Sequence, residues 1–307
     1  MAGIPKVAFM DKETVAKYKK AGEITKECQE LSAKKLKPGM NLFEFAEEIE
    51  AAMVKKGGAP AFPINLSRNH VAAHYTPAFE SEDVAGDGDV IKVDIGVHVD
   101  GFIADSASTI DFSGKHGAMV KASQDALEKA VSMAKEGVAV GEIGAAVEGA
   151  IRGAGFRPIQ NLSGHGVDEY DAHTQPTIPN IGSKDSRELE EGMAFAIEPF
   201  ATDGIGLVHE GSQAEIFQLV KKSPVRSADA RKILEFVDEN YSNLPFAERW
   251  LQRELKLTEF GRKVAMKELM LRKCISAFPL LKEEEGKTVT QAETTLLLNE
   301  GKVIRLL

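Results

Sequence analysis

The sequence predicts an α+β fold of two related halves, with a helical segment inserted into the second half. Helical and strand-like patterns alternate in blocks along the 307 residues, two short segments recur in the same order, and region 206–272 interrupts the alternation. We therefore expect one domain formed by residues 1–205 and 273–307. Residues 206–272 are expected to form an inserted helical subdomain.

The first half begins with two helical patterns. Residues 11–36 carry an apolar stripe at helical spacing, and Asp11 is a suitable N-cap. A second helix is expected from Leu42 to the pair Gly57-Gly58, since glycine favours a helix C-terminus. Strand-like segments follow at about 59–75 and 89–112.

The second half repeats this order. Helices are expected at about 118–135 and 141–152, and strands at about 156–165 and 192–201; the Thr-rich tail TVTQAETTLLL predicts a final strand. Residues 39–45 match 137–143 at an offset of 98, and 65–67 match 161–163 at an offset of 96. Two matches in one order indicate related halves, and a cleft between such halves is a natural place for a site.

Composition excludes several classes of protein. The 38 Lys and Arg against 47 Asp and Glu give a net charge of −9, which argues against a nucleic-acid or anionic-membrane partner. Region 206–272 holds 12 basic and 10 acidic residues, too small a surplus to change this. The two cysteines are too few for a disulfide framework, the N-terminus lacks the apolar run of a signal peptide, and no apolar stretch approaches the ~20 residues of a membrane span. We expect a soluble, cytoplasmic protein.

The strongest local signal is a hairpin that carries two aspartates. Asp100-Gly101 is a turn signal between two apolar runs that contain Asp94 and Asp105. With the loop at 100–101 the two carboxylates lie diagonally on one face, and with the loop at 99–100 they are directly opposed. In either register they share one face, where two anionic groups are costly unless a cation or a proton holds them. The competing reading is a pair of solvated aspartates.

Three more polar residues stand in unusual contexts. Glu198 and Glu293 lie inside predicted apolar strands, which normally avoid carboxylates, and His165 lies in Leu-Ser-Gly-His-Gly, whose small residues would let a metal or substrate approach. Each alone could be a buried, hydrogen-bonded group. Together with Asp94 and Asp105 they make four carboxylates and one imidazole, a set that suits Mn, Fe(II), Co or Zn. Four carboxylate charges match two divalent ions.

These five residues appear in the order and local contexts of the methionine aminopeptidases, and the chain resembles that family over nearly its whole length. The motif Ala-Ala-His74-Tyr-Thr-Pro and the pair Ala172-His173 add to the resemblance. The long gap between Glu198 and Glu293 resembles type 2 enzymes, and the start near the first helix resembles the archaeal form. The resemblance implies the pita-bread fold, with residues 1–205 and 273–307 as its catalytic domain.

The resemblance also implies a role for each site residue. Asp94 would bind one metal, His165 and Glu198 the other, and Asp105 and Glu293 would bridge them. Glu198 would also shuttle a proton, His173 would steady the reacting peptide, and His74 would contact substrate near the leaving amide. An apolar pocket for the methionine side chain would be lined by Phe62, Ala172, Phe200 and Phe278. The two divalent ions would be Co, Mn, Fe(II), Zn or Ni, a choice that the sequence leaves open.

The implied activity is removal of the initiator methionine from peptides and nascent proteins whose second residue is small. Two alternatives remain open: a proline-specific peptidase of the same fold, and a catalytically dead binding protein. The full set of five ligands argues against the second alternative. The expected partners are N-terminal Met peptides and nascent polypeptides, with the ribosome as a further candidate, and the resemblance implies a monomer.

Overall fold

The first half of the chain forms two helices that cover a twisted sheet. The computed structural model describes residues 9–307. Residues 1–8, which belong to the predicted catalytic domain and to the N-terminus expected to lack a signal peptide, lie outside the described residues. The helices are α1 (Lys12–Lys35) and α2 (Leu42–Lys55), and Asp11 caps α1 by accepting from the Thr14 amide at 2.7 Å. Their strands are β1 (Ala59–Pro60), β2 (Asn65–Arg68), β3 (Val71–Ala73), β4 (Val90–Val99) and β5 (Phe102–Asp111).

The second half repeats this arrangement and confirms the predicted repeat. Helices α3 (Gly117–Met133) and α4 (Val140–Gly153) correspond to α1 and α2, and α4 and α2 each have 14 residues. Isolated bridges from Asn41 to Val84 and from Ala139 to Glu188 precede the two helices at equivalent positions. Their strands are β6 (Arg157–Pro158), β7 (Ser163–Asp168), β8 (Asp171–Pro179), β9 (Ala194–Ile197), β10 (Phe200–Thr202), β16 (Val289–Gln291), β17 (Thr294–Asn299) and β18 (Lys302–Arg305).

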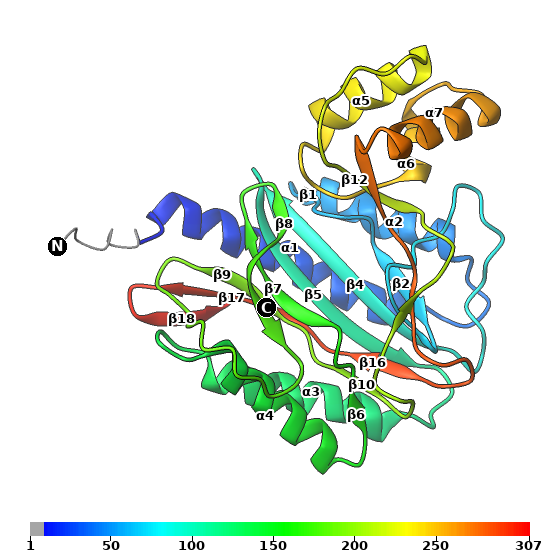
Figure 1. The fold of residues 1–307 in the computed structure, drawn as a ribbon. Coiled ribbons are helices and arrows are strands. Elements are labelled where there is room, and N and C mark those ends of the chain that lie inside the picture. The colour runs from blue at the N-terminus through cyan, green and yellow to red at the C-terminus, as the bar shows by residue number, and fades with distance from the viewer. Residues whose placement is uncertain (1–8) are drawn as a thin grey trace.

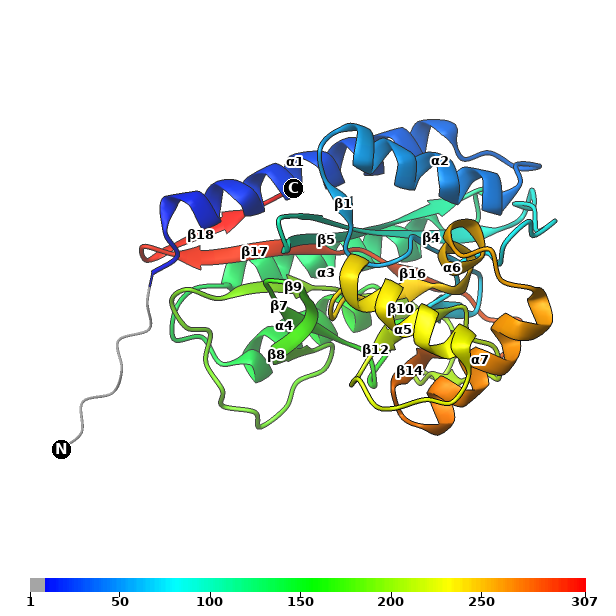
Figure 2. The same ribbon diagram turned by 90° about the horizontal axis from the view of Figure 1, so that it is seen from above.

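Two larger sheets and their helices position the site. Strand β4 pairs with β1, β2 and β5, and a second sheet has the order β18-β17-β9-β7-β8. Strands β5 and β17 lie side by side, which brings the two halves together along the middle of the molecule (Figures 1 and 2). Apolar side chains of α1 and α2 pack on β4, while those of α3 and α4 pack on β9 and β17. Each half therefore buries its own core.

A helical segment is inserted between strands β10 and β16 of the second half. It contains α5 (Ala228–Asn240), α6 (Glu248–Glu254) and α7 (Glu259–Leu271), which share a separate apolar core around Trp250. In Figure 1 helices α5 and α7 stand apart from α1–α4, while α6 lies beside α2. Short strands connect them to the rest: β11 (His209–Glu210), β12 (Ile216–Leu219), β13 (Phe246–Ala247), β14 (Ile275–Phe278) and β15 (Leu281–Lys282). The bounds 206–272 for an inserted subdomain stay a prediction.

The hairpin of β4 and β5 has the first of the two registers expected from the sequence. Val99 pairs with Phe102 across the loop Asp100-Gly101, and Gly96 pairs with Asp105. Asp94 pairs with Ala107 and therefore lies diagonally from Asp105 on the same face. Asp100 and Gly101 both have positive φ, as a tight two-residue loop requires.

Two predicted strands are each broken at a glutamate, which corrects the expectation that Glu198 and Glu293 lie inside strands. Glu198 falls between β9 and β10, and Glu293 falls between β16 and β17. Ile197 pairs with Thr294 on one side of the gap, and Phe200 pairs with Gln291 on the other. Both ladders keep the same register, so Glu198 and Glu293 lie opposite each other. Pro199 explains part of the break, because proline has no N–H to donate to a ladder.

No helix in the described part of the chain is long and apolar enough to cross a membrane.

Candidate active site

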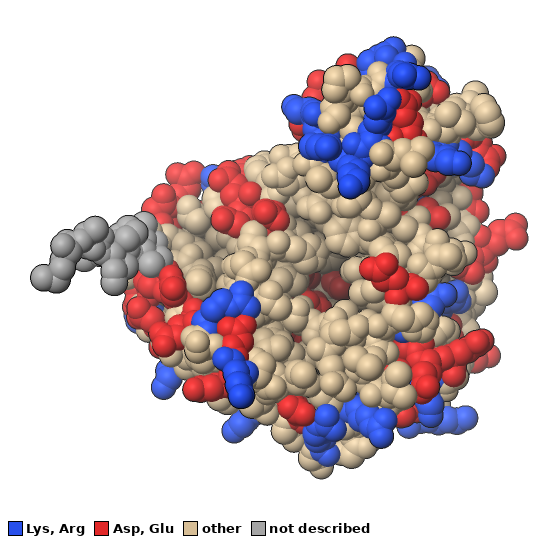
Figure 3. Space-filling model, viewed as in Figure 1, with Lys and Arg blue, Asp and Glu red and all other residues tan. Residues whose placement is uncertain are grey.

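A pocket of about 380 Å³ lies between the two halves and collects the predicted ligands. In the space-filling view a hollow near the middle of the molecule shows acidic atoms at its bottom (Figure 3). The predicted site residues that line the pocket are Phe62, His74, Asp94, Asp105, His165, His173, Glu198, Phe200, Phe278 and Glu293. They come from β4, β5, β7, β8, β10 and β14, from the two strand breaks, and from the segments that follow β1 and β3, so the fold assembles the site from both halves.

The two halves are joined directly at the carboxylates. The amide of Glu293 donates to the carbonyl of Ala107 in β5 at 2.9 Å. The amide of Asp105 donates to Thr295 Oγ1 at 2.7 Å, and the same hydroxyl donates to the Asp105 carbonyl at 2.8 Å. These bonds fix the aspartate strand against the glutamate strand, so the four carboxylates have little freedom to separate.

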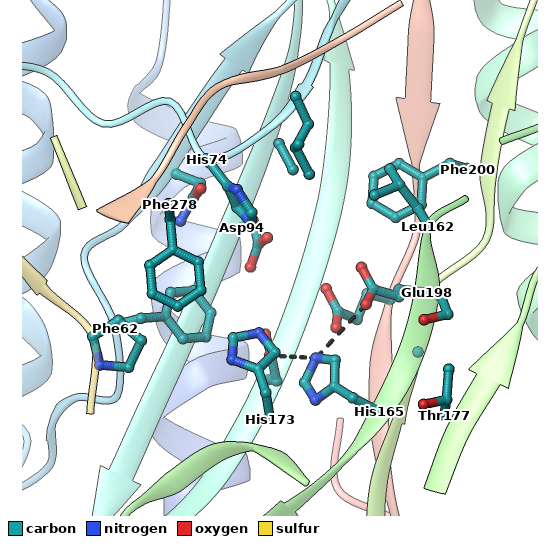
Figure 4. A pocket seen from close by; sticks show the side chains of 18 of the residues that line it. Phe62, His74, Asp94, Leu162, His165, His173, Thr177, Glu198, Phe200 and Phe278 are labelled. Atoms are coloured by element: carbon teal, nitrogen blue, oxygen red, sulfur yellow. Dashed lines mark ion pairs between the residues drawn. The ribbon is translucent and has the colours of Figure 1, made fainter. Parts of the chain in front are cut away.

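His165 presents one ring nitrogen to the carboxylates. Its Nδ1 lies 3.1 Å from the Gly166 carbonyl, which can only accept, so Nδ1 carries the proton and Nε2 carries a lone pair. Nε2 lies 3.7 Å from Asp105 Oδ2 and 3.6 Å from Glu198 Oε1, the contacts dashed in Figure 4. Burial lowers the pKa of His165 to about 4, so the ring is neutral at pH 7. A metal-binding histidine is neutral, donates one ring N–H to a carbonyl or carboxylate and keeps the other nitrogen free for the metal, and His165 has this arrangement.

The sheet requires the glycines beside His165. The expectation that small residues there let a metal or substrate approach stays a prediction, and Gly164 does line the pocket. A Cβ at Gly164 would lie 2.3 Å from the Ala196 carbonyl oxygen, and one at Gly166 would lie 2.2 Å from that of Gln175. The glycines allow β7 to pack closely against its neighbours β9 and β8.

The carboxylates form a cluster that a cation fits. Asp105, His165 and Glu293 each offer a ligand atom, and these atoms lie within 4.8 Å of one another. Within residues 9–307, Asp94 Oδ1 and Asp105 Oδ1 are buried without a hydrogen-bond partner. A buried acceptor without a partner is costly, and a divalent ion would satisfy both oxygens. The donor set of carboxylates and one imidazole therefore fits a divalent transition-metal ion.

Burial and mutual repulsion hold protons on the cluster. Burial raises the pKa of Asp94 to about 7, although hydrogen bonds from Gln291 and Asp105 oppose the shift. The pKa values of Asp105 and Glu293 rise well above their ordinary range because of burial and the neighbouring carboxylates. Burial, followed by the charge of Asp94, raises the pKa of Glu198 in the same direction. Groups that cannot all be ionised together are typical of a site whose charge a cation balances.

Metal-free protein should therefore lose stability as pH rises. The folded-state pKa of Asp94, about 7, lies above its ordinary value of 3.8, so between these pH values the folded protein holds a proton that the unfolded chain has lost. Below about pH 6.5 the lowered pKa of His165 acts in the opposite sense. Stability with EDTA should therefore fall between about pH 6.5 and about pH 8, where the raised pKa values of Asp105, Glu198 and Glu293 keep protons on the folded protein that the unfolded chain has lost. A divalent cation replaces these protons, so the rise in Tm on adding MnCl2 should be larger at the higher pH. Scanning calorimetry at both pH values measures this, and equal rises would contradict it.

Gln291 is a site residue that the sequence did not reveal. Its side-chain amide donates to Glu293 Oε2 at 3.1 Å and to Glu198 Oε2 at 3.4 Å, so it bridges the two opposed glutamates. It lies two residues before Glu293 and is buried. The only available signal was its place in an apolar strand on the same face as Glu293, which is too weak to distinguish it from an ordinary buried amide.

Two further histidines and Phe278 stand over the ligands. The His165 and His173 ring centroids are 4.5 Å apart, and Phe278 packs 5.4 Å from His74 and 6.0 Å from His173 (Figure 4). His74 Nδ1 lies 3.0 Å from the Pro279 carbonyl, so Nδ1 is the protonated nitrogen. Burial lowers the pKa values of His74 and His173, so both rings are neutral at pH 7.

The apolar wall of the pocket contains three of the four predicted residues. Phe62, Phe200 and Phe278 line it, whereas Ala172 is outside the pocket lining and is fully buried in the cluster that also contains Phe62. A Cβ at Gly96 would lie 2.2 Å from the Phe62 ring, so this glycine makes room for the aromatic side chain. Residues not expected from the sequence complete the wall: Leu162, Ile216, Pro245 and Leu281.

Comparison with known proteins agrees with this arrangement. The sequence model described as Metallopeptidase family M24 matches residues 16–224. The methionine aminopeptidase of Pyrococcus horikoshii is 45% identical over 290 residues, which cover 94% of this chain and 98% of the relative. Two solved structures share the fold. A thermophilic Arx1 has a TM-score of 0.83 at 16% identity and covers 97% and 91% of the two chains. A methionine aminopeptidase from Thermotoga maritima has a TM-score of 0.70 at 21% identity, and the match covers 97% of this chain and 98% of that structure.

Proposed function

The chain belongs to metallopeptidase family M24, and on this premise we propose that it is a methionine aminopeptidase of the pita-bread fold. It removes the N-terminal methionine of peptides and nascent proteins whose second residue is small. One observation carries the proposal: four carboxylates and one imidazole meet at the bottom of a pocket whose wall is aromatic and aliphatic. The relative in Pyrococcus horikoshii, which aligns over almost its whole length, supports it.

The enzyme uses divalent metal. We propose two ions per chain, with Asp94 binding one, His165 and Glu198 binding the other, and Asp105 and Glu293 shared between them. Four carboxylates balance the charge of two divalent cations, and the presence of both aspartates and both glutamates in one pocket supports this count. When bound, the ions would polarise the scissile carbonyl and supply an activated water. Co, Mn, Fe(II), Zn and Ni all remain candidates for the identity of the metal.

The residues of the chain bind and orient the substrate around this centre. Phe62, Phe200 and Phe278 offer an apolar surface to a methionine side chain, whose thioether also makes favourable contacts with aromatic rings. His74 is neutral with its proton on Nδ1, so its Nε2 can accept from the amide N–H beside the scissile bond. His173 is the ring closest to His165 in the aromatic group and can donate to the oxygen that develops charge.

Glu198 carries the proton in this proposal. Its raised pKa favours a carboxyl that takes up a proton and later delivers it to the leaving amine. It lies opposite Glu293 and 3.6 Å from His165 Nε2, at the edge of the ligand cluster and within the pocket. Its amide neighbour Gln291 steadies the far oxygen, Oε2, which leaves Oε1 on the side of His165.

The substrate class also suggests where the protein works. Initiator methionines arise on nascent chains in the cytoplasm, so we propose a cytoplasmic enzyme that acts as a monomer and meets its substrates close to the ribosome. The likeness to Arx1 concerns the fold.

Release of free methionine from Met-Gly-Met-Met tests the proposal. Protein stripped with EDTA should be inactive, and refilling with Co(II) or Mn(II) should restore release, because the ligand cluster needs its cations. Ala-Pro peptides serve as the control for a proline-specific enzyme, and we expect the protein not to cleave them. Cleavage of Ala-Pro alone would move the protein to that branch, and no cleavage with any of the metals would support a binding protein without activity.

A further inference from the structure

A buried arginine connects the helical segment to the walls of the active site. Arg249 of α6 is 1% exposed and is one of the largest fully buried side chains in the described residues. Its guanidinium donates to Glu47 Oε1 at 3.2 Å and to Glu50 Oε1, both on α2. Its Nη1 donates to Thr76 Oγ1, two residues beyond His74. One side chain thus joins α6, α2 and the segment that carries an active-site histidine.

The same network reaches the segment that carries Phe62. The Glu50 carboxylate accepts from the amide of Ile64 at 3.1 Å, and the hydroxyl of Thr76 donates to the Ile64 carbonyl at 2.7 Å. Both backbone polar groups of Ile64 are therefore held by Glu50 and Thr76, two of the groups that accept from Arg249. Phe62 and Asn65, on either side of Ile64, line the pocket.

The geometry of His74 requires such support. Its φ is +69°, in the left-handed region that a non-glycine residue occupies only when the surrounding structure holds it there. Its Nδ1–H donates to the carbonyl of Pro279, which follows strand β14. Strand β14 pairs with β12, and β12 pairs in turn with β13, the strand that leads directly into α6. The His74 ring is therefore fixed at Nδ1 by the end of β14, and the chain two residues beyond His74 is fixed by the bonds of Thr76 to Arg249 and Ile64.

We propose that Arg249 is a positioning residue, through which the helical segment holds His74 and the Phe62 wall in the geometry that substrate requires. The helical segment also reaches the pocket directly, since Pro245 and Ile216 line it. The inference rests on the proposed function, because it assigns His74 and Phe62 to the substrate peptide. It gives the segment between Glu198 and Glu293 a part in substrate binding that is separate from holding the metal ligands.

Removing Arg249 itself would leave Glu50 buried without its partner and would endanger folding, so the test acts on Thr76. Thr76→Val keeps the shape and leaves Arg249 paired with Glu47 and Glu50, but it removes the hydroxyl between Arg249 and Ile64. Thr76→Ser keeps the hydroxyl and serves as the rescue variant. Thr202→Val is the matched control, because Thr202 is buried, donates to Thr288 O and accepts from Gly204 N away from this network.

Three measurements separate positioning from simple loss of stability. The first is the ¹⁵N spectrum of the His74 ring, which reports its tautomer and hydrogen bond without any turnover. The second is kcat and KM on Met-Gly-Met-Met, and the third is Mn²⁺ affinity by calorimetry. We expect Thr76→Val to shift the His74 ring signals and to lower kcat/KM roughly tenfold or more, with Mn²⁺ affinity within about twofold of wild type. Thr76→Ser and Thr202→Val should match wild type in all three.

Unchanged His74 signals in Thr76→Val, or a loss of kcat/KM no larger than in Thr202→Val, would overturn the inference. A fall in Mn²⁺ affinity that accounts for the lost activity would also overturn it, because the effect would then lie at the metal ligands. If wild-type protein releases no methionine, the proposed function fails, while the His74 spectrum still decides whether Thr76 and Arg249 position the ring.

Discussion

Replacing Glu198 by glutamine should lower kcat for methionine release by about 10²–10⁴-fold, the usual contribution of a positioned acid–base group. The amide keeps the size of the carboxylate and can still lie opposite Glu293 in the strand gap, but it cannot take up and return a proton. The same change should raise the Tm of metal-free protein. Burial and the charge of Asp94 raise the pKa of Glu198, so at neutral pH the unfolded chain gains free energy by ionising a carboxyl group that the folded protein keeps protonated. A glutamine does not ionise in either state, so it removes this cost of folding.

The combination of the two effects makes the test specific. Steady-state kinetics on Met-Gly-Met-Met with saturating Mn²⁺ gives kcat, and scanning calorimetry with EDTA gives the Tm. Glu239→Gln is the control, since Glu239 is an exposed glutamate of α5 outside the pocket lining. It should change neither quantity. A Glu198→Gln variant with wild-type kcat would remove Glu198 from the chemistry, and a lower metal-free Tm would contradict the repulsion within the cluster.

Replacing Gly164 by alanine should destabilise the protein by about 3 kcal/mol, at the upper end of the usual range for overpacking. The new Cβ would lie 2.3 Å from the Ala196 carbonyl oxygen, and a strand backbone cannot yield as a flexible side chain can. Strand β7 would have to move away from β9, and His165 would move with it because it pairs with Ala196. Metal affinity should therefore fall together with the Tm.

Gly149→Ala provides a control of the opposite sign. Gly149 is exposed in the middle of α4, and a Cβ there would meet nothing within 4 Å. Alanine favours a helix interior over glycine, so this variant should gain about 0.5–1 kcal/mol. Urea titration of both variants, with and without Mn²⁺, measures the two changes. A Gly164→Ala protein as stable as wild type would show that β7 and β9 have more room than the structure gives them.

Local patterns in the sequence determined most of the fold. Apolar spacing predicted the helices of both halves, and the matched segments predicted their relation. The equal lengths of α2 and α4 and the equivalent bridges before them confirm that relation. The Asp100-Gly101 turn limited the β4–β5 hairpin to two registers, and side-chain alternation placed Asp94 and Asp105 on one face in both. Charged residues inside apolar runs pointed to the ligands, because such residues are costly to bury without a partner.

Other features depend on segments that are far apart in the sequence. Glu198 and Glu293 face each other because two ladders on either side of a gap keep one register, and no local pattern contains that pairing. Gln291 belongs to the site only because it bonds to both glutamates. Ala172 does not line the pocket because it is buried in the same apolar cluster as Phe62. In the same way, Arg249 reaches Thr76 across 173 positions of the chain.

The division has a physical reason. The sequence by itself determined which side chains are apolar, which turn or cap an element, and which carry a chemistry out of place in a core, since these follow from neighbouring residues. The tertiary structure alone decided which strands oppose each other, where a strand breaks, and which buried donors meet which acceptors. These depend on the simultaneous packing of both halves and the helical segment, in which every buried polar group must find its partner.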